Sequence, residues 1–279
     1  MNKIKKLLTI LAVTVALFIP NVVIAKTINF AIASDINYKT SNDGNTLQEK
    51  VLNGFIDRVN ENNYDFVIFL GDNIDKSKQK ELERFLNKIK AIKTPYYLVM
   101  GNKDVHKISG LDKKDYLTIV SKHNKYQKKA TNNYTFRPTA DLTVIVLDSV
   151  SSGMPTNHGI FNKKTLSWLD TTLEKNKRRK VLIFQHIPYL PPYEKEGYDI
   201  LDKQEYKAVL SKHKNILAVI SGHYHKEGFS YDGSGVGHYC APALSEEPFY
   251  YVDAQVKYTK PLIFKGRNFK IDGTLKPAI

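Results

Sequence analysis

The stretch "ILAVISGHYHKEG" (residues 216–228) decides the fold, because an apolar run ends there at a glycine and two histidines follow it. Apolar runs of this length are typical of buried strands, so His223 and His225 would lie where the backbone leaves the core. Two imidazoles at that point are either polar loop residues or metal ligands. The residues at the ends of the other predicted strands distinguish these two interpretations.

Four more apolar runs end in the same way. "NFAIASD" ends at Asp35, "FVIFLGD" at Asp72, "YYLVMGN" at Asn102 and "VLIFQH" at His186. Strands that alternate with helical patterns predict an α/β domain with a mainly parallel sheet. In such sheets the carboxyl ends of the strands meet at one edge, where ligands bind. We therefore expect two carboxylates, one carboxamide and three imidazoles in one crevice.

Apolar residues at helical spacing predict helices between these strands. The predicted helices cover residues 46–60, 76–92, 163–180 and 203–214. From Phe229 onward, short aromatic stretches bounded by turns predict strands, which we expect to form a second sheet packed on the first. No repeat or linker divides the chain, so residues 26–279 are expected to form one domain.

The donor set at the strand ends combines carboxylate, amide and imidazole groups without a thiolate. Such a set suits a first-row divalent ion such as manganese, iron or zinc. Asp72 is the natural bridge between two ions, because a carboxylate offers two oxygens. Each of these residues alone could be an ordinary polar group at the end of a strand, but six of them at the ends of five apolar runs favour a metal centre.

The ordered motifs also resemble a known family. They are Asp35, "GDNID" (71–75), "GN" (101–102), "HIP" (186–188) and "GHYH" (222–225). Together they resemble the calcineurin-like metallophosphoesterase family over nearly all of the chain after residue 25. The segment before "HIP" is similar to the cyclic-nucleotide-phosphodiesterase and purple-acid-phosphatase-like branches. The resemblance implies an α/β fold, a four-layer α/β/β/α sandwich of two mixed sheets flanked by helices, with two metal ions at the strand ends.

The same resemblance implies which residues bind each ion. The second ion would take Asp72, Asn102, His186 and His223, and the first would take Asp35, His225 and the shared Asp72. The implied reaction is hydrolysis of a phosphoester bond by hydroxide that the two ions activate. The two histidines of the opening stretch would then serve different ions.

The chain departs from the family pattern at the first strand. The family usually has D-x-H there, whereas this chain has Asn37 in the histidine position. A carboxamide oxygen is a weaker ligand than imidazole for these ions. We expect Asn37 or Asp75 to complete the first site, and an exposed turn residue is the alternative for each.

A second departure follows "GN", where the family usually has a histidine that binds phosphate and protonates the leaving oxygen. Here the residue is Lys103, which could clamp phosphate, and Lys103 or His106 would be the candidate acid, unless His106 is a solvated loop residue. General-acid help is worth about 10²- to 10⁴-fold in rate. Aryl diesters, whose leaving groups depart without a proton, should therefore react faster than simple monoesters. Asn102, Lys103 and Tyr189 are expected to contact substrate.

The lysine- and tyrosine-rich region 105–137 either lines the substrate entrance or is an ordinary solvated helix and loop. The formal net charge of +14 suits anionic partners. We expect a phosphorylated small molecule, and no dedicated nucleic-acid surface, because no nucleic-acid-binding motif is found. The two departures leave a second class of function open, a catalytically degenerate protein that binds a phosphorylated ligand or partner without turnover.

Residues 1–25 have the pattern of a secretory signal peptide, with a positive start, a short apolar stretch, and Val23 and Ala25 as small residues before the cleavage point. An uncleaved anchor is the alternative, but the apolar stretch is short for a membrane span of about 20 residues. We expect a secreted or periplasmic protein with no stable membrane anchor after cleavage. Cys240 is the only cysteine, so packing or bound metal must provide the stability that disulfides give many exported proteins.

Overall fold

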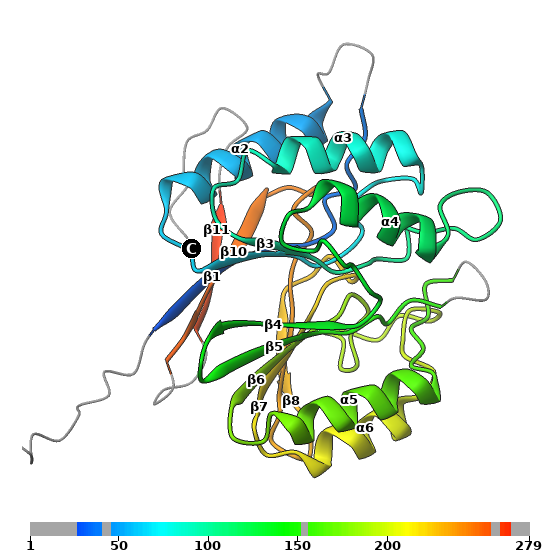
Figure 1. Ribbon diagram of the computed structural model, residues 1–279, viewed down its shortest axis with the longest axis vertical. Helices are drawn as coiled ribbons and strands as arrows, with labels where there is room; N and C mark the ends of the chain where they lie inside the picture. The colour runs from blue at the N-terminus through cyan, green and yellow to red at the C-terminus, as the bar shows by residue number, and fades with distance from the viewer. Residues whose placement is uncertain (1–26, 41–45, 152–155, 258–262, 269–279) are drawn as a thin grey trace, which may run out of the picture.

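Two β-sheets lie face to face between two layers of helices in the computed structural model, which describes residues 27–40, 46–151, 156–257 and 263–268 (Figure 1). This four-layer α/β/β/α arrangement is the one expected from the sequence. The signal peptide predicted over residues 1–25 lies outside the described residues. None of the described helices combines the length and apolar character needed to cross a membrane.

The first sheet has five strands in the order β11-β10-β1-β2-β3. Its strands are β1 (Ile28–Ala33), β2 (Phe66–Phe69), β3 (Tyr96–Leu98), β10 (Tyr250–Val256) and β11 (Ile263–Asn268). The first three run parallel, and β10 and β11 are antiparallel to their neighbours. The helices on its outer face are α2 (Leu47–Glu61), α3 (Gln79–Ile89) and α4 (Lys113–His123).

The second sheet has six strands in the order β4-β5-β6-β7-β9-β8. Its strands are β4 (Tyr134–Thr139), β5 (Leu142–Val146), β6 (Lys180–Phe184), β7 (Ile216–Ser221), β8 (Gly228–Tyr231) and β9 (Gly237–Cys240). β5, β6, β7 and β9 run parallel, whereas β4 and β8 are antiparallel edge strands. Its outer face is covered by α5 (Lys163–Lys175) and α6 (Lys203–Lys212).

Three separate apolar clusters fill the spaces between the four layers. The cluster between the sheets contains Phe30, Phe66 and Phe184, all fully buried, and the rings of Phe30 and Phe66 stack with their centroids 4.6 Å apart. The other two clusters lie between each sheet and its own helices. Because both faces of each sheet are buried, the central strands are continuous apolar runs, which is why the sequence shows them so clearly.

The local sequence accounts for the ends of the elements. Thr46 caps α2, since its side chain accepts a hydrogen bond from the Glu49 amide while the Glu49 carboxylate accepts one from the Thr46 amide. The helix therefore begins where the sequence predicted it. The other three predicted helices are also present, two to six residues shorter than the apolar pattern suggested.

The prediction for the C-terminal strands was wrong in one respect. They do not form a sheet of their own, because β8 and β9 extend the second sheet beyond β7, whereas β10 and β11 extend the first sheet beyond β1. In β10, Ala254 lies opposite Phe30 of β1, so its buried residues join the core between the sheets. Alternation of buried and exposed residues shows that a strand exists, but it does not show which exposed strand edge it covers.

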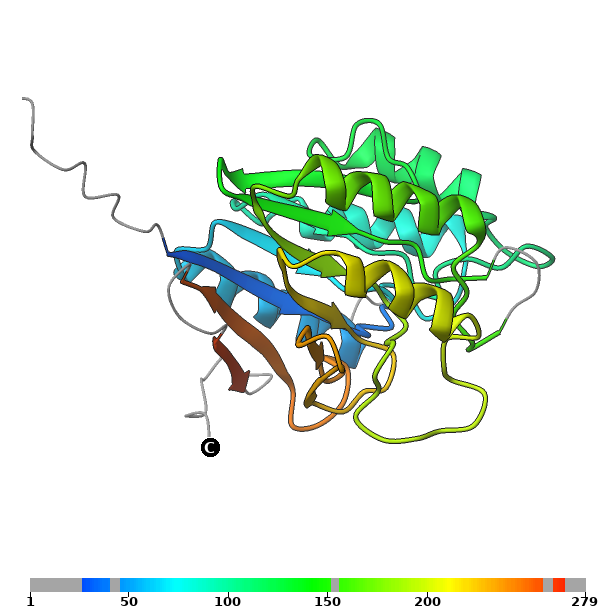
Figure 2. The same ribbon diagram turned by 90° about the horizontal axis from the view of Figure 1, so that it is seen from below.

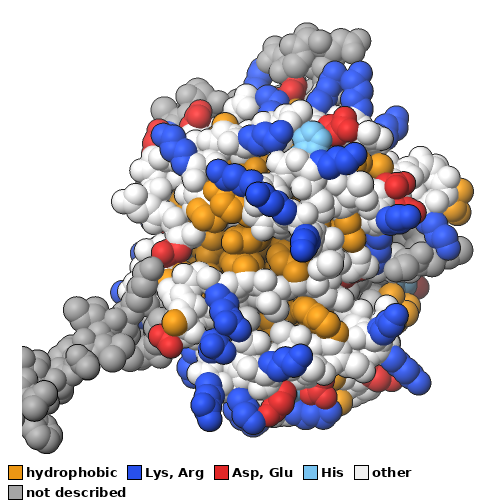
Figure 3. Space-filling model, viewed as in Figure 1, with side chains coloured by type: hydrophobic (Ala, Val, Ile, Leu, Met, Phe, Trp, Pro, Cys, Tyr) orange, Lys and Arg blue, Asp and Glu red, His pale blue; other side chains and the backbone are white. Residues whose placement is uncertain are grey.

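The parallel strands of both sheets end on the same side of the molecule (Figure 2). The loops that follow β1, β2, β3, β6 and β7 therefore meet there, and these are the loops that carry the predicted ligands. On the face shown in Figure 3, lysine and arginine side chains are spread over both halves of the molecule rather than gathered in one stripe.

Candidate metal centre

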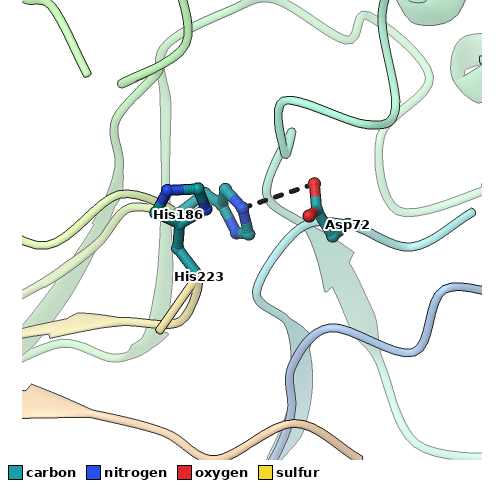
Figure 4. A group of neighbouring side chains, drawn as sticks. All are labelled: Asp72, His186 and His223. Carbon is teal, nitrogen blue, oxygen red and sulfur yellow. Dashed lines mark ion pairs between the residues drawn. The ribbon is translucent and has the colours of Figure 1, made fainter. Parts of the chain in front are cut away.

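Asp72, His186 and His223 form a buried cluster at the carboxyl ends of β2, β6 and β7. One potential ligand atom from each lies within 4.8 Å of the others, and Figure 4 shows the two imidazoles next to one another with Asp72 opposite, joined to His186 by a dashed line. All three residues are at most 4% exposed. A cluster of one carboxylate and two imidazoles at this depth has the donor chemistry of a divalent-metal site.

The tautomer of His186 is fixed by the backbone. Its Nδ1 lies 2.8 Å from the carbonyl oxygen of Leu70, and because a carbonyl can only accept, Nδ1 must donate. Its Nε2 then faces Asp72 Oδ1 at 3.3 Å and Asn102 Oδ1 at 3.1 Å. The two oxygens and Nε2 thus converge, as the ligands of a single ion would.

The second imidazole is oriented in a corresponding way. Nε2 of His223 donates to the carbonyl oxygen of Asn157 at 2.9 Å, which leaves Nδ1 as the nitrogen with a free lone pair. The side chain of Asn157 also accepts a hydrogen bond of 3.1 Å from Asn102 Nδ2. Asn157 therefore positions two candidate ligands at once, and no motif in the sequence pointed to it.

The two imidazoles differ sharply in their electrostatics. Burial opposes the charge of His186, but the adjacent Asp72 carboxylate outweighs it and raises the pKa of His186 to about 9. Burial and the neighbouring His186 lower the pKa of His223 to about 3. A proton on His186 beside Asp72 therefore balances the charge at the place where a cation would bind.

Asp35 and His225 form the other half of the centre. Asp35 Oδ2 accepts hydrogen bonds from Ser34 Oγ at 2.5 Å and from the His223 amide at 2.9 Å. Asp35 Oδ1 is buried and has no hydrogen-bond partner among the described residues, although His225 Nε2 lies 3.3 Å away. An unpartnered buried carboxylate oxygen next to an imidazole nitrogen fits a second ion on this side.

The backbone is strained at the same positions. The non-glycine residues with positive φ in the described part of the chain are Asp35, Asn37, Asp72, His223 and His225, with φ between 47° and 70°. All of them are predicted site residues. Since such conformations cost free energy, their concentration here indicates that the surrounding fold holds the ligands in place.

Glycines allow the strand ends to approach one another. A side chain at Gly222 would meet Ser34 Oγ at 1.9 Å, and one at Gly71, which has φ of 95°, would meet the His186 ring at 2.6 Å. Neither position could hold a larger residue without separating the loops that carry the ligands.

Comparison with known proteins agrees with this geometry. The model of the calcineurin-like phosphoesterase family matches residues 28–227, a span that includes every predicted ligand. The chain belongs to the calcineurin-like phosphoesterase family. The resemblance seen in the sequence motifs is thereby confirmed.

Relatives of this chain cleave different phosphate bonds, according to their names. A manganese-dependent ADP-ribose/CDP-alcohol diphosphatase of Arabidopsis thaliana is 22% identical, over 81% of this chain and 90% of its own length. A probable glycerophosphodiester phosphodiesterase of Arcobacter nitrofigilis is 26% identical, over 58% of this chain and 57% of its own length. A dimetal phosphatase from Danio rerio shares the fold with a TM-score of 0.69 and 18% identity, over 86% of this chain and 96% of its own.

Asn37 and Lys103, the two residues that depart from the family pattern, are in contact. Lys103 Nζ donates a 2.8 Å hydrogen bond to Asn37 Oδ1, and the Lys103 amide donates one of 2.8 Å to Asp72 Oδ1. Asn37 is buried, and its Nδ2 donates to the Asp35 carbonyl and to Ser245 Oγ. The oxygen expected to bind the first ion is therefore in contact with the ammonium of Lys103.

Asp75 and His106 lie further out. Both line a cavity of about 450 Å³ that also reaches Asn102, Lys103 and Asn157. His106 Nδ1 accepts a hydrogen bond from the Ser109 amide at 3.1 Å. Asp75 and His106 are thus placed at the cavity beside the metal cluster rather than within it.

Tyr189 is not brought to the centre. Its ring is 7% exposed and packs against Tyr206 and His238 in the core between the second sheet and its helices. The substrate contact predicted for Tyr189 is wrong, because the apolar side chain is used for packing. Tyr198 takes the place beside the ligands, with its ring 4.8 Å from that of His223.

Asp104 connects two of the loops that carry ligands, a role that no motif in the sequence indicated. Its fully buried carboxylate accepts hydrogen bonds from the Gly101 amide, the Ile74 amide and Asn73 Nδ2, at 2.8 to 3.0 Å. Burial and the nearby Asp72 carboxylate raise the pKa of Asp104 to about 7. The functional motif therefore extends from "GN" to "GNKD" (101–104), because its last residue holds the loop that carries Asn102.

The region 105–137 lines a cavity next to the centre, and its role at a substrate entrance stays a prediction. A cavity of about 550 Å³ extends from Asn102 along α4, between apolar residues such as Leu117 and basic ones such as Lys107 and Lys114. Lys113 also lines it, but its Nζ is held by Asp148 at 2.5 Å and by the carbonyl of Val150 at 2.6 Å. The cavity therefore has room for the organic part of a substrate next to the candidate ligands.

Proposed function

We propose that this protein hydrolyses phosphodiester or diphosphate bonds of small molecules with two divalent ions, and that it does so as a secreted or periplasmic enzyme. The observation that carries the proposal is the convergence of His186 Nε2, Asp72 Oδ1 and Asn102 Oδ1, with His223 beside them. Asp35 and His225 would hold the other ion, with Asp72 shared between the two.

Bound divalent ions in such a centre lower the pKa of water and neutralise charge on the phosphoryl oxygens. The protein supplies the positions. Leu70 and Asn157 orient the two imidazoles through their carbonyl groups, and Asp104 holds the loop of Asn102. Preorganised ligands of this kind avoid the cost of rearrangement during the reaction.

Substrates with two substituents on phosphorus, or with a diphosphate, fit this centre better than simple monoesters. Two cavities leave the centre near Asn102, one of about 550 Å³ along α4 and one of about 450 Å³ past Lys103. The relatives named as a phosphodiesterase and as a diphosphatase support the same bond classes. Manganese is the first ion to test, since one relative is named as manganese-dependent.

The decisive experiment is hydrolysis of bis(p-nitrophenyl) phosphate by the metal-depleted protein with and without added manganese. The wild type and His123→Ala, a control at a half-buried histidine at the end of α4, should be active with manganese, and His223→Ala should not. Failure of the folded, manganese-loaded wild type to cleave this ester, other phosphodiesters and diphosphates would refute the proposed activity.

One observation favours a second candidate, a binding protein without turnover. Because Asn37 Oδ1 is in contact with Lys103, the first site offers one ligand fewer than the second. Metal analysis separates the candidates, since two manganese ions per chain support the enzyme and one or none supports the binding protein.

Export is proposed from the sequence of residues 1–25 and is tested separately. The intact mass of the protein recovered from its native cells should correspond to a chain that begins at Lys26. A chain that retains Met1 would contradict cleavage.

A further inference from the structure

Asn37 and Lys103 stand at the two positions where the chain departs from its family, and the structure places them in contact. Lys103 Nζ donates to Asn37 Oδ1 at 2.8 Å. The residues are 66 positions apart in the sequence and come from different loops, after β1 and β3. Two unusual residues that meet in this way are best explained as one functional unit.

The orientation of the Asn37 amide is set by its partners. Its Nδ2 donates to the carbonyl oxygen of Asp35 at 3.1 Å and to Ser245 Oγ at 3.2 Å. Since the Asp35 carbonyl accepts only and the Lys103 ammonium donates only, the reversed amide would lose both bonds. Asn37 is also only 8% exposed, so its side chain has little freedom to turn toward an ion.

Lys103 is consequently held at both ends. Its backbone amide donates to Asp72 Oδ1 at 2.8 Å, and its ammonium donates to Asn37. The ammonium has no carboxylate partner within ion-pair distance in the described part of the chain, although Asp35 and Asp72 lie on the neighbouring loops. A fixed cation without an anionic partner, beside a metal centre, is suited to bind an anionic part of the substrate.

The cavity of about 450 Å³ next to Lys103 has the same character. Lys76 and Lys78 line it as well, and Asp75 is the only acidic residue among its lining residues. The imidazole of His106 at its wall is engaged by Ser109. The space beyond Lys103 therefore offers positive charge and hydrogen-bond donors rather than a proton donor placed at the centre.

We propose that Asn37 is a positioning residue for Lys103 and not a metal ligand, and that Lys103 binds an anionic leaving group, so that the preferred substrate is a diphosphate whose leaving group is a phosphate monoester. This rests on the proposed hydrolytic function. Water adds to one phosphorus, and the bond from that phosphorus to the bridging oxygen breaks with its electron pair. The products are two phosphate monoesters, and two protons pass to solvent.

A phosphate leaving group matches the residue that is present. An alkoxide needs a proton as it departs, whereas a phosphate monoester, with a second pKa of about 6, leaves as an anion at neutral pH. A lysine ammonium stabilises that anion by a charge-assisted hydrogen bond. Free inorganic phosphate is the alternative ligand for Lys103, and the binding measurements compare it with a phosphate monoester.

The test compares two substrates, ADP-ribose, which is a diphosphate, and bis(p-nitrophenyl) phosphate. The leaving group of the second substrate also departs without a proton at neutral pH, but it has no phosphate that Lys103 could bind. In Lys103→Gln, kcat/KM for ADP-ribose should fall by about 10- to 100-fold, the range of one charge-assisted hydrogen bond, while the aryl ester changes by less than about 3-fold. Lys103→Arg should recover part of the loss, and Lys177→Gln, at an exposed remote lysine, should match the wild type.

Asn37→Ala should produce the same selective loss, and it should add little in the Lys103→Gln background, because the two residues act as one unit. Two readouts do not depend on turnover. Asn37→Ala should keep the manganese content of the wild type, and both single variants should bind AMP at least about 10-fold more weakly in calorimetry, with inorganic phosphate affected less.

Three results would overturn the inference. They are an equal loss on both substrates in Lys103→Gln, the loss of a manganese ion in Asn37→Ala, and unchanged AMP affinity in both variants. In each case a wild type that cleaves the aryl ester with manganese leaves the proposed function intact. A wild type that binds manganese and cleaves neither substrate refutes the proposed function itself, and the inference with it.

Discussion

The two halves of the metal centre differ in what holds their ligands. In the half formed by Asp72, Asn102, His186 and His223, backbone carbonyls orient both imidazoles. In the half formed by Asp35 and His225, the imidazole is held by Glu246, whose carboxylate lies 2.5 Å from His225 Nδ1 and is 57% exposed. We call them the His186 half and the His225 half.

The difference shows how firmly each ion would be bound. The carbonyl of Leu70 directly follows β2 and cannot move without disturbing the sheet, so His186 is oriented before any ion arrives. An exposed carboxylate is a weaker constraint, because water competes for it. The His225 half has also exchanged one usual ligand for Asn37, which contacts Lys103. We therefore expect the His186 half to bind its ion more tightly.

The largest expected effect comes from removing one imidazole from each half. His186→Ala should lower kcat/KM for an aryl diester by more than about 100-fold and remove the tightly bound manganese. His225→Ala should remove the weakly bound ion and lower the rate by a smaller factor when manganese is in excess. Metal analysis and kinetics on the two variants check this. A His225→Ala protein that is the more impaired of the two would reverse the comparison.

Asp104 offers a second contrast, between a buried acid that supports the His186 half and an acid at the cavity rim. Asp104→Ala leaves the Gly101 and Ile74 amides without their acceptor, so the metal-free protein should lose about 2–4 kcal/mol of its free energy of unfolding. Asp75→Ala, whose carboxylate lines a cavity, should change it by less than about 0.5 kcal/mol. Urea unfolding in a chelator measures both, and equal losses would show that Asp104 has no special role.

The His186 half was accessible from the sequence, and the supports around it were not. Its ligands follow apolar runs at the carboxyl ends of strands, and strand ends converge for reasons that hold in every parallel sheet. The backbone carbonyl of Asn157 orients His223, and the carboxylate of Asp104 accepts three N–H hydrogen bonds. Both kinds of contact depend on how loops that are distant in the sequence meet. Their residue types carry no periodic signal.

Tyr189 and Asn37 show a different limit of the sequence. Both stand beside ligand motifs, and proximity along the chain suggested that they take part in the site. The side chain of Tyr189 turns into the core instead, and that of Asn37 turns toward Lys103. The direction in which a side chain leaves a loop depends on backbone angles such as the φ of 48° at Asn37, and no pattern in the sequence specifies these angles.

Acid should weaken metal binding in the His186 half. The pKa of His186 in the metal-free protein is raised to about 9 by Asp72, and an ion must displace that proton from Nε2. Below pH 9 the folded protein binds the proton, so the apparent affinity for manganese should fall by up to about tenfold for each unit of pH decrease. Titration calorimetry at pH 6.5, 7.5 and 8.5 in buffers of different ionisation enthalpy tests this. Proton release near zero at pH 7.5 would contradict the assigned state of His186.

The smallest effect is expected at Glu246. Because its carboxylate is exposed and only orients His225, Glu246→Gln should weaken the second manganese ion by about 2- to 5-fold and leave the tightly bound one unchanged. The glutamine can still accept from Nδ1, so the ring keeps its orientation but loses the charge beside it. Glu196→Gln, at an exposed glutamate without a part in the centre, is the control. A loss of more than about 100-fold would mean that Glu246 binds the ion directly. The His225 half would then have replaced its missing histidine with a carboxylate, and the two halves would be equally complete.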